Sequence, residues 1–172
     1  MDRGARVALV VGIVLLAGGC GYRLAGAGLG GTDSIAIRTP RNDSFEPGVE
    51  YVVADALRRE LLRRSSDALI EDPAEADVVV SGRILPIESR ARSLSSAILG
   101  REQEIVLAVD LDAVRRDGSA VALPGGALRE TERYLASADI EAQRKNRDEA
   151  LRRLAAILAT RFFDEMGEAL SR

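Results

Sequence analysis

Hydrophobic positions along the chain recur with two periods, and together they predict a body of helices and strands that begins near Ser34. Residues 49–64 repeat apolar side chains at helical spacing, and their arginines gather in the last turns, where they complement the helix dipole. A second helix is expected to begin at Asn146, or as early as Ser137, with the apolar stripe Leu151, Leu154, Ala155, Leu158, Phe162 and Met166. Each helix therefore presents one apolar face to a core.

Alternating and β-branched segments predict the strands, which are expected at 34–39, 76–88, 105–114 and, after a turn at Asp117-Gly118, between 120 and 135. Gly82 and Pro86 interrupt the second of these segments, as they would at a bulge or a sheet edge. The order strand, helix, three strands, helix predicts an α+β fold. In this fold, two helices pack on one face of a mostly antiparallel four-stranded sheet.

The chain opens with a different pattern. Arg3 and Arg6 precede eleven apolar residues at 7–17, a run typical of a signal peptide and too short to span a bilayer comfortably. Two small residues then lead to Cys20, so residues 1–19 are predicted to be a lipoprotein signal peptide. Ala17 stands where such signals usually carry Leu. An ordinary secreted protein with a chance cysteine remains the alternative interpretation.

The predicted processing leaves Cys20 at the mature N-terminus, carrying diacylglycerol and an N-acyl chain. Two or three acyl chains anchor a protein essentially permanently. Residues 20–33 are then the lipidated N-terminus and a glycine-rich tether, and residues 34–172 are a single α+β domain. Gly21 follows the cysteine where an Asp would resemble an inner-membrane retention signal, so we expect an outer-membrane anchor.

Composition narrows the chemistry further. The chain has no histidine, which removes the usual general base and most zinc and iron sites, and Cys20 is its only cysteine. A net charge of −3 argues against general nucleic-acid binding. Carboxylates that could pair, Asp110 with Asp112 and Asp164 with Glu168, are interpreted as solvated polar faces. We therefore expect no enzyme, no metal site and no cofactor.

One segment differs from the surface of a plain soluble domain. Residues 89–101 are expected to form a loop that places apolar side chains between arginines: Arg90, Arg92, Leu94, Ile98, Leu99 and Arg101. Apolar residues in a connection are often partner contacts, and guanidinium groups suit phosphates and carboxylates. The loop is thus the candidate contact for an anionic glycolipid or a protein wall; the alternative is that it folds onto its own core.

Several motifs resemble those of the LptE family of LPS-assembly lipoproteins. Residues 19–24 (GCGYRL) resemble the family's opening, and Asn42 in the segment 39–44 resembles its strand-end asparagine. The segments 74–78 and 82–84 resemble a family strand, and residues 148–170 resemble its C-terminal helix. Each motif is weakly specific alone, but together the motifs occur in the family's order and span nearly the whole mature chain.

This resemblance implies an outer-membrane subunit of the LPS translocon. Such a subunit would occupy the lumen of an LptD-type β-barrel as plug and assembly partner, bind LPS, and face the periplasm or the lumen. Two other interpretations remain. One is another envelope-assembly or secretion-associated lipoprotein of similar fold, and the other is a lipid-anchored enzyme of unusual mechanism.

Overall fold

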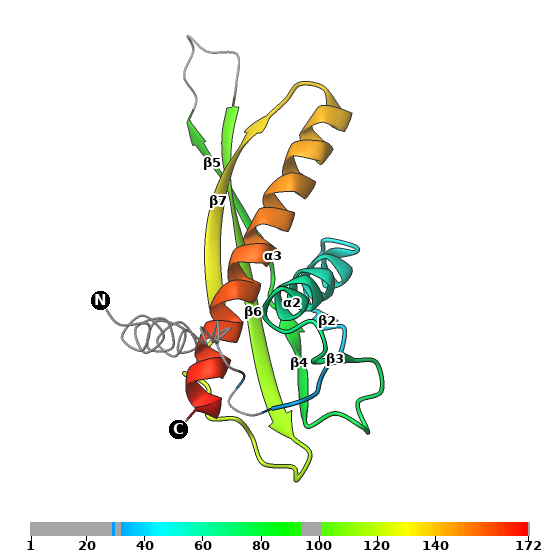
Figure 1. Ribbon diagram of the computed structural model, residues 1–172. Coiled ribbons are helices and arrows are strands. Elements are labelled where there is room, and N and C mark those ends of the chain that lie inside the picture. Colours follow the sequence, from blue (N-terminus) through cyan, green and yellow to red (C-terminus); the bar gives the residue numbers. More distant parts are fainter. Residues whose placement is uncertain (1–28, 30–31, 94–100, 172) are drawn as a thin grey trace, which may run out of the picture.

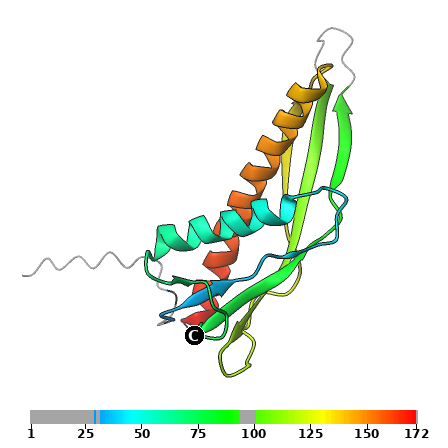
Figure 2. The same ribbon diagram turned by 90° about the vertical axis from the view of Figure 1, so that its right-hand side faces the viewer.

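Two helices lie against the same face of a long, twisted sheet in the computed structural model of the protein (Figures 1 and 2). The structure describes residue 29 and the ranges 32–93 and 101–171. The predicted signal peptide, Cys20 and most of the predicted tether lie outside the described residues.

The elements follow one another as β1 (Ile35–Ile37), β2 (Arg41–Asn42), α2 (Val49–Arg64), β3 (Leu69–Ile70), β4 (Val78–Ile84), β5 (Glu88–Ser93), β6 (Arg101–Arg115), β7 (Leu128–Ala136) and α3 (Ile140–Leu170). The α+β class is confirmed. The expected count of four strands is wrong, because the described sheet has seven. The sheet is mostly antiparallel as expected, and the short strands β1, β2 and β3 pair in parallel and make it mixed.

The sheet is organised around the 15-residue strand β6. On one side β6 pairs antiparallel with β4 and then β5, and on the other side it pairs antiparallel with β7. The short strands β1 and β2 instead run parallel to β4, and β3 runs parallel to β1. The helix α2 supplies the crossover that parallel pairing requires. Strands of two or three residues are too short to show a period, so the sequence pattern could not reveal β2 and β3.

The loop predicted at 89–101 is wrong for residues 89–93 and 101, which belong to the paired strands β5 and β6 of one hairpin. Arg90 and Arg92 lie in β5, Arg101 begins β6, and the register pairs Arg90 with Glu104. The strand β5 is polar apart from Ala91, and its residues 88–91 are exposed on both faces, so it shows no hydrophobic alternation. Leu94, Ile98 and Leu99 lie outside the described residues.

The helix α2 matches the predicted range, whereas α3 begins at neither predicted start. Asp139 caps α3, and its side chain accepts a hydrogen bond from the backbone N–H of Glu141. The expected helix start at Asn146 is therefore wrong. This residue lies within α3 and donates from Nδ2 to the carbonyl of Leu135, at the edge of β7, over 2.9 Å.

The core lies between the helices and the inner face of the sheet. Its largest fully buried side chains include Ile35, Leu57, Leu61, Ile84, Ile105, Leu107, Leu154, Leu158, Phe162, Phe163 and Met166. Alternate residues of β6 point the other way, and no helix of the described ranges covers that outer face (Figure 2). The predicted one-sided packing of the helices is thus confirmed.

Gly82 allows β4 and β6 to approach closely. A Cβ atom at this position would overlap the carbonyl oxygen of Asp110 and come within 2.9 Å of the Cα of Leu111. The residue needs to be glycine because the partner strand occupies the space, so the predicted interruption of the strand is a close strand contact.

Candidate functional site

The two strands of the β5–β6 hairpin carry three of the arginines proposed as contacts. Arg90 is exposed, and its Nη2 lies 2.7 Å from the Glu88 carboxylate on the same strand. Its charge is therefore partly balanced within the protein. Arg92 and Arg101 are placed by their backbone on the same hairpin. The structure thus brings the three arginines to one end of the sheet, while the apolar residues proposed with them lie outside the described ranges.

The base of this hairpin is fixed by Arg147 of α3. Its Nη2 lies 2.6 Å from Oε2 of Glu46, which precedes α2. Its Nη1 donates to the Ser89 hydroxyl of β5 over 2.9 Å and to the Tyr134 hydroxyl of β7 over 3.3 Å. Tyr134 in turn donates to Gln103 of β6 over 2.6 Å. One guanidinium therefore connects the helix to both hairpin strands and to β7.

Asn42 fixes the loop that carries Glu46. Its Nδ2 donates to the Glu46 carbonyl and to the Glu50 carboxylate, each over 2.8 Å. Its Oδ1 accepts from the backbone N–H of Ser44 over 2.9 Å. The loop therefore has a defined shape, on which the side chain of Phe45 is fully exposed. The role of Asn42 agrees with the strand-end position suggested by the family resemblance.

Sequence reasoning missed Arg147, Glu46 and Tyr134. The contacts of Arg147 join residues 13 to 101 positions apart, and no local motif marks them. Arg147 also lies in a segment rich in charged residues, where most side chains are solvated. Only the three-dimensional arrangement distinguishes it.

The uncovered sheet face carries paired charges in rows across the strands. Arg83 of β4 lies 2.9 Å from Asp110 of β6. Glu88 is shared by Arg90 at 2.7 Å and by Arg129 of β7 at 3.7 Å. The strand register places these side chains on one face, together with Thr131 and Arg133. The face is polar, with its charges largely balanced internally.

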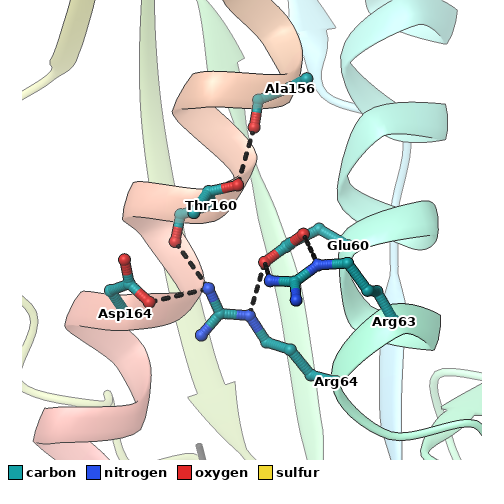
Figure 3. Close-up of polar contacts among 6 residues, drawn as sticks. All are labelled: Glu60, Arg63, Arg64, Ala156, Thr160 and Asp164. Atoms are coloured by element: carbon teal, nitrogen blue, oxygen red, sulfur yellow. Dashed lines mark hydrogen bonds and ion pairs between the residues drawn. The ribbon is translucent and has the colours of Figure 1, made fainter.

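A second set of charges lies where α2 meets α3 (Figure 3). Glu60 is 8% exposed and accepts hydrogen bonds from Arg63 and Arg64. Arg64 also lies 2.7 Å from Asp164, and its guanidinium carbon lies 5.8 Å from the centre of the Phe163 ring. The hydrogen bond from Arg63, and then that from Arg64, lower the pKa of Glu60 against the opposing effect of burial. This cluster joins the helices, and its Glu60 carboxylate is ionised at neutral pH.

The described residues offer little that resembles a catalytic centre. Within residue 29 and the ranges 32–93 and 101–171, no group of three or more Asp, Glu, Cys or His side chains could hold a metal ion. Asp110 and Asp164, each considered as half of a carboxylate pair, contact Arg83 and Arg64 respectively. None of the helices in these ranges has the length and apolar character needed to cross a membrane.

Solved structures of several bacterial proteins share this fold. A Caulobacter crescentus CB15 protein is 15% identical, with a TM-score of 0.52 over 86% of this chain and 96% of that chain. Lipoprotein B of Nitrosomonas europaea is 15% identical, with a TM-score of 0.54 over 79% and 83%. PelC of Paraburkholderia phytofirmans, a dodecamer, is 15% identical, with a TM-score of 0.50 over 79% and 88%. At such identities the likeness establishes the fold alone.

The family comparison is more specific. No curated protein matches the chain. The model of the LptE family, described as lipopolysaccharide-assembly, matches residues 32–166, a range that contains every described helix and strand apart from the last turn of α3. The chain therefore belongs to the LptE lipopolysaccharide-assembly family.

Proposed function

We propose that this LptE-like lipoprotein is the outer-membrane subunit of the LPS translocon that occupies the lumen of an LptD-type β-barrel. In this proposal Cys20 carries the lipid anchor, and the α+β domain acts as plug and assembly partner. The β5–β6 hairpin, with Arg90, Arg92 and Arg101 on its strands, contributes to LPS delivery. The family match over residues 32–166 is the observation that carries the proposal.

The uncovered sheet face supports a position inside a barrel. The lumen of an outer-membrane barrel is polar and wet, whereas its outer surface is apolar. A plug must therefore present a polar surface that does not need a hydrophobic partner. The outer face of β4, β5, β6 and β7 has this character, because Arg83, Glu88 and Arg129 find partners across the strands. Such a face can meet a lumen wall through hydrogen bonds and bridging water.

The protein is proposed to act by binding rather than by catalysis. LPS carries phosphate groups and acyl chains, so its recognition calls for guanidinium groups beside apolar side chains. The proposed contacts combine Arg90, Arg92 and Arg101 with Leu94, Ile98 and Leu99. The contacts of Arg147 support this role, because they hold the base of the hairpin against α3.

Recovery of a barrel with the full-length lipidated protein from detergent extracts tests the proposal. We expect a large β-barrel protein of the LptD type to co-purify. The double variant Arg83→Glu, Arg133→Glu should recover much less barrel, since it places like charges beside Asp110 and Glu104 and disturbs the outer face. Arg144→Glu is the control, because Arg144 is exposed on α3 and, among the described residues, pairs with Glu141 on the same helix. We expect this control to recover a normal amount of barrel.

Two outcomes would contradict the proposal. If no barrel co-purifies with the unmodified protein, the chain is instead another envelope-assembly or secretion-associated lipoprotein. If the barrel is recovered equally with the double variant and the control, the outer face is not its contact surface. The Cys20→Ala variant should be recovered in the soluble fraction and not in the membrane fraction. This result tests the lipid anchor on Cys20 independently of the barrel.

A further inference from the structure

A basic hollow lies at the end of the sheet opposite the β5–β6 hairpin. It has a volume of about 360 Å³ and is lined by residues that follow β1, that precede β4, and that belong to β4 and the end of β6. Three arginines line it, Arg38, Arg115 and Arg116, beside an apolar wall that includes Val79 and Val114. We call this feature the foot hollow.

The arginines of the foot hollow differ in how many of their N–H groups already contact other protein groups. Nε of Arg116 donates to the Ala76 carbonyl over 3.2 Å, and its Nη2 lies 3.1 Å from Asp77 and contacts the Glu75 carbonyl. Arg115 donates from Nη1 to the Ala120 carbonyl over 3.3 Å. Within the described ranges, the Arg38 guanidinium contacts no acid or carbonyl, and Nη1 of Arg116 makes no protein hydrogen bond. The hollow therefore has donors available for an anion.

The foot hollow lies where the chain enters the domain from the predicted anchor. Ile35, the first residue of β1, pairs with Val78, which pairs in turn with Arg115. Ser34 donates to the Asp77 carboxylate from its backbone N–H over 3.1 Å and from its hydroxyl over 2.9 Å. Asp77 thus contacts both the end of the tether and Arg116 of the hollow.

The length of the tether places this end near the membrane. Residues 20–33 are glycine-rich, and a glycine-rich chain of that length has a root-mean-square end-to-end distance of about 20 Å. That distance is comparable with the diameter of a small domain. With the lipid anchor on Cys20, the basic hollow at this end of the domain therefore lies on average nearer to the lipid headgroups than the hairpin at the opposite end.

We propose that the foot hollow binds the phosphate of an anionic phospholipid headgroup in the leaflet that holds the anchor. Arg38 and Nη1 of Arg116 donate to the phosphate oxygens, and the wall formed by Val79 and Val114 contacts the glycerol backbone of the lipid. Asp77 keeps Arg116 in place. The hydrogen bond from Ser34 is the main cause that lowers the pKa of Asp77, and Arg116 lowers it further. This inference rests on the lipid anchor of the proposed function, but it needs no barrel.

Vesicle binding by the full mature chain with Cys20→Ala tests the inference, because this variant isolates the hollow from the anchor. We expect the protein to co-sediment with vesicles of phosphatidylethanolamine containing phosphatidylglycerol, and to remain in solution with phosphatidylcholine vesicles. Introducing Arg38→Gln into the Cys20→Ala protein should weaken its binding to the anionic vesicles about fivefold, which is the effect of one basic residue near an anionic surface. Arg38 is exposed and has no described partner, so this change should leave the unfolding midpoint unchanged.

Arg144→Gln is the matched control, since it removes the same charge from exposed α3 far along the chain. It should leave vesicle binding close to that of the parent protein. Equal losses for the two variants would overturn the inference, because they would indicate a general effect of net charge. Equal binding to anionic and neutral vesicles would overturn it as well.

Inorganic phosphate separates a lipid ligand from a free anion. If millimolar phosphate binds in an Arg38-dependent manner as tightly as the vesicles do, the lipid assignment is wrong. Barrel recovery with lipidated Arg38→Gln should be normal. Failure of the vesicle assay with normal barrel recovery would therefore refute the foot hollow alone, whereas loss of barrel from the unmodified protein would refute the proposed function.

Discussion

The ion cluster between α2 and α3 allows a quantitative prediction for Glu60→Ala. This change removes an almost fully buried carboxylate that accepts from two arginines. Loss of one partner from a buried ion pair costs about 3–5 kcal/mol. Arg64 keeps its contacts with Asp164 and with the Thr160 carbonyl, so we expect the lower end, about 3 kcal/mol. In a domain of this size that loss lowers Tm by about 6–12 °C.

The matched control is Arg63→Ala. The Arg63 side chain is 66% exposed although it contacts the same carboxylate, and exposed ion pairs contribute about 0–1 kcal/mol. Urea unfolding followed by circular dichroism gives both free energies of unfolding. A loss for Arg63→Ala that equals or exceeds that of Glu60→Ala would refute the argument that burial decides the magnitude.

The stability difference between the unmodified protein and Glu60→Ala is also expected to depend on pH. Arg63 first, and then Arg64, lower the pKa of Glu60 in the folded protein. The contribution of Glu60 to stability is therefore complete above its unfolded-state pKa of about 4.3 and is lost as pH falls through the lower folded-state pKa. The stability gap between the unmodified protein and Glu60→Ala should be constant from neutral pH down to about 5 and should narrow below about 4. A gap that does not change with pH would show that the carboxylate charge contributes nothing.

Three other changes test other parts of the fold. Gly82→Ala should lower the free energy of unfolding by about 3 kcal/mol, because its Cβ would overlap the Asp110 carbonyl. Gly125→Ala, which has open space around its Cβ, should leave the urea midpoint nearly unchanged, and similar midpoints for the two variants would contradict this expectation. Asn42→Ala should cost about 1–2 kcal/mol in urea unfolding by releasing the loop before α2; an unchanged free energy would show that the loop holds its shape without Asn42. Arg147→Met should speed amide hydrogen exchange in β5 while leaving β4 unchanged, and equal protection in both proteins would refute its role at the hairpin base.

Much of the fold could be predicted from patterns that follow directly from burial. The strand β6 alternates because only one of its faces is covered, and its buried residues Ile105 and Leu107 lie within the strand predicted at 105–114. The helix α2 shows a clear stripe for the same reason. The paired strands β2 and β3 left no pattern, because two residues cannot display a period. The sequence of β5 predicts a loop because the strand is short and is exposed on both faces at residues 88–91, which leaves polar side chains around Ala91.

The candidate site was less accessible to sequence reasoning. The resemblance to a family correctly gave the class of protein, and it drew attention to Asn42. The residues that hold the hairpin in place could not be found this way, because Arg147 and Glu46 lie 101 positions apart and meet only through the packing of α3 beside α2. The foot hollow was missed for a similar reason. Arg38 and Arg116 come from different strand ends that the parallel pairing of β1 with β4 brings together.

The parallel position of β1 has a mechanical consequence for a tethered protein. A load carried by the tether would enter at Ser34, where β1 lies between β3 and β4. Pulling along β1 would shear its bonds together, among them Ile35 to the Ala68 carbonyl at 2.7 Å and Arg38 to the Val80 carbonyl at 2.9 Å, rather than open them one at a time. The contacts of Ser34 with Asp77 would share that load. The end of the domain that follows the tether should therefore resist a pulling force. The hairpin at the opposite end can move without placing a load on β1.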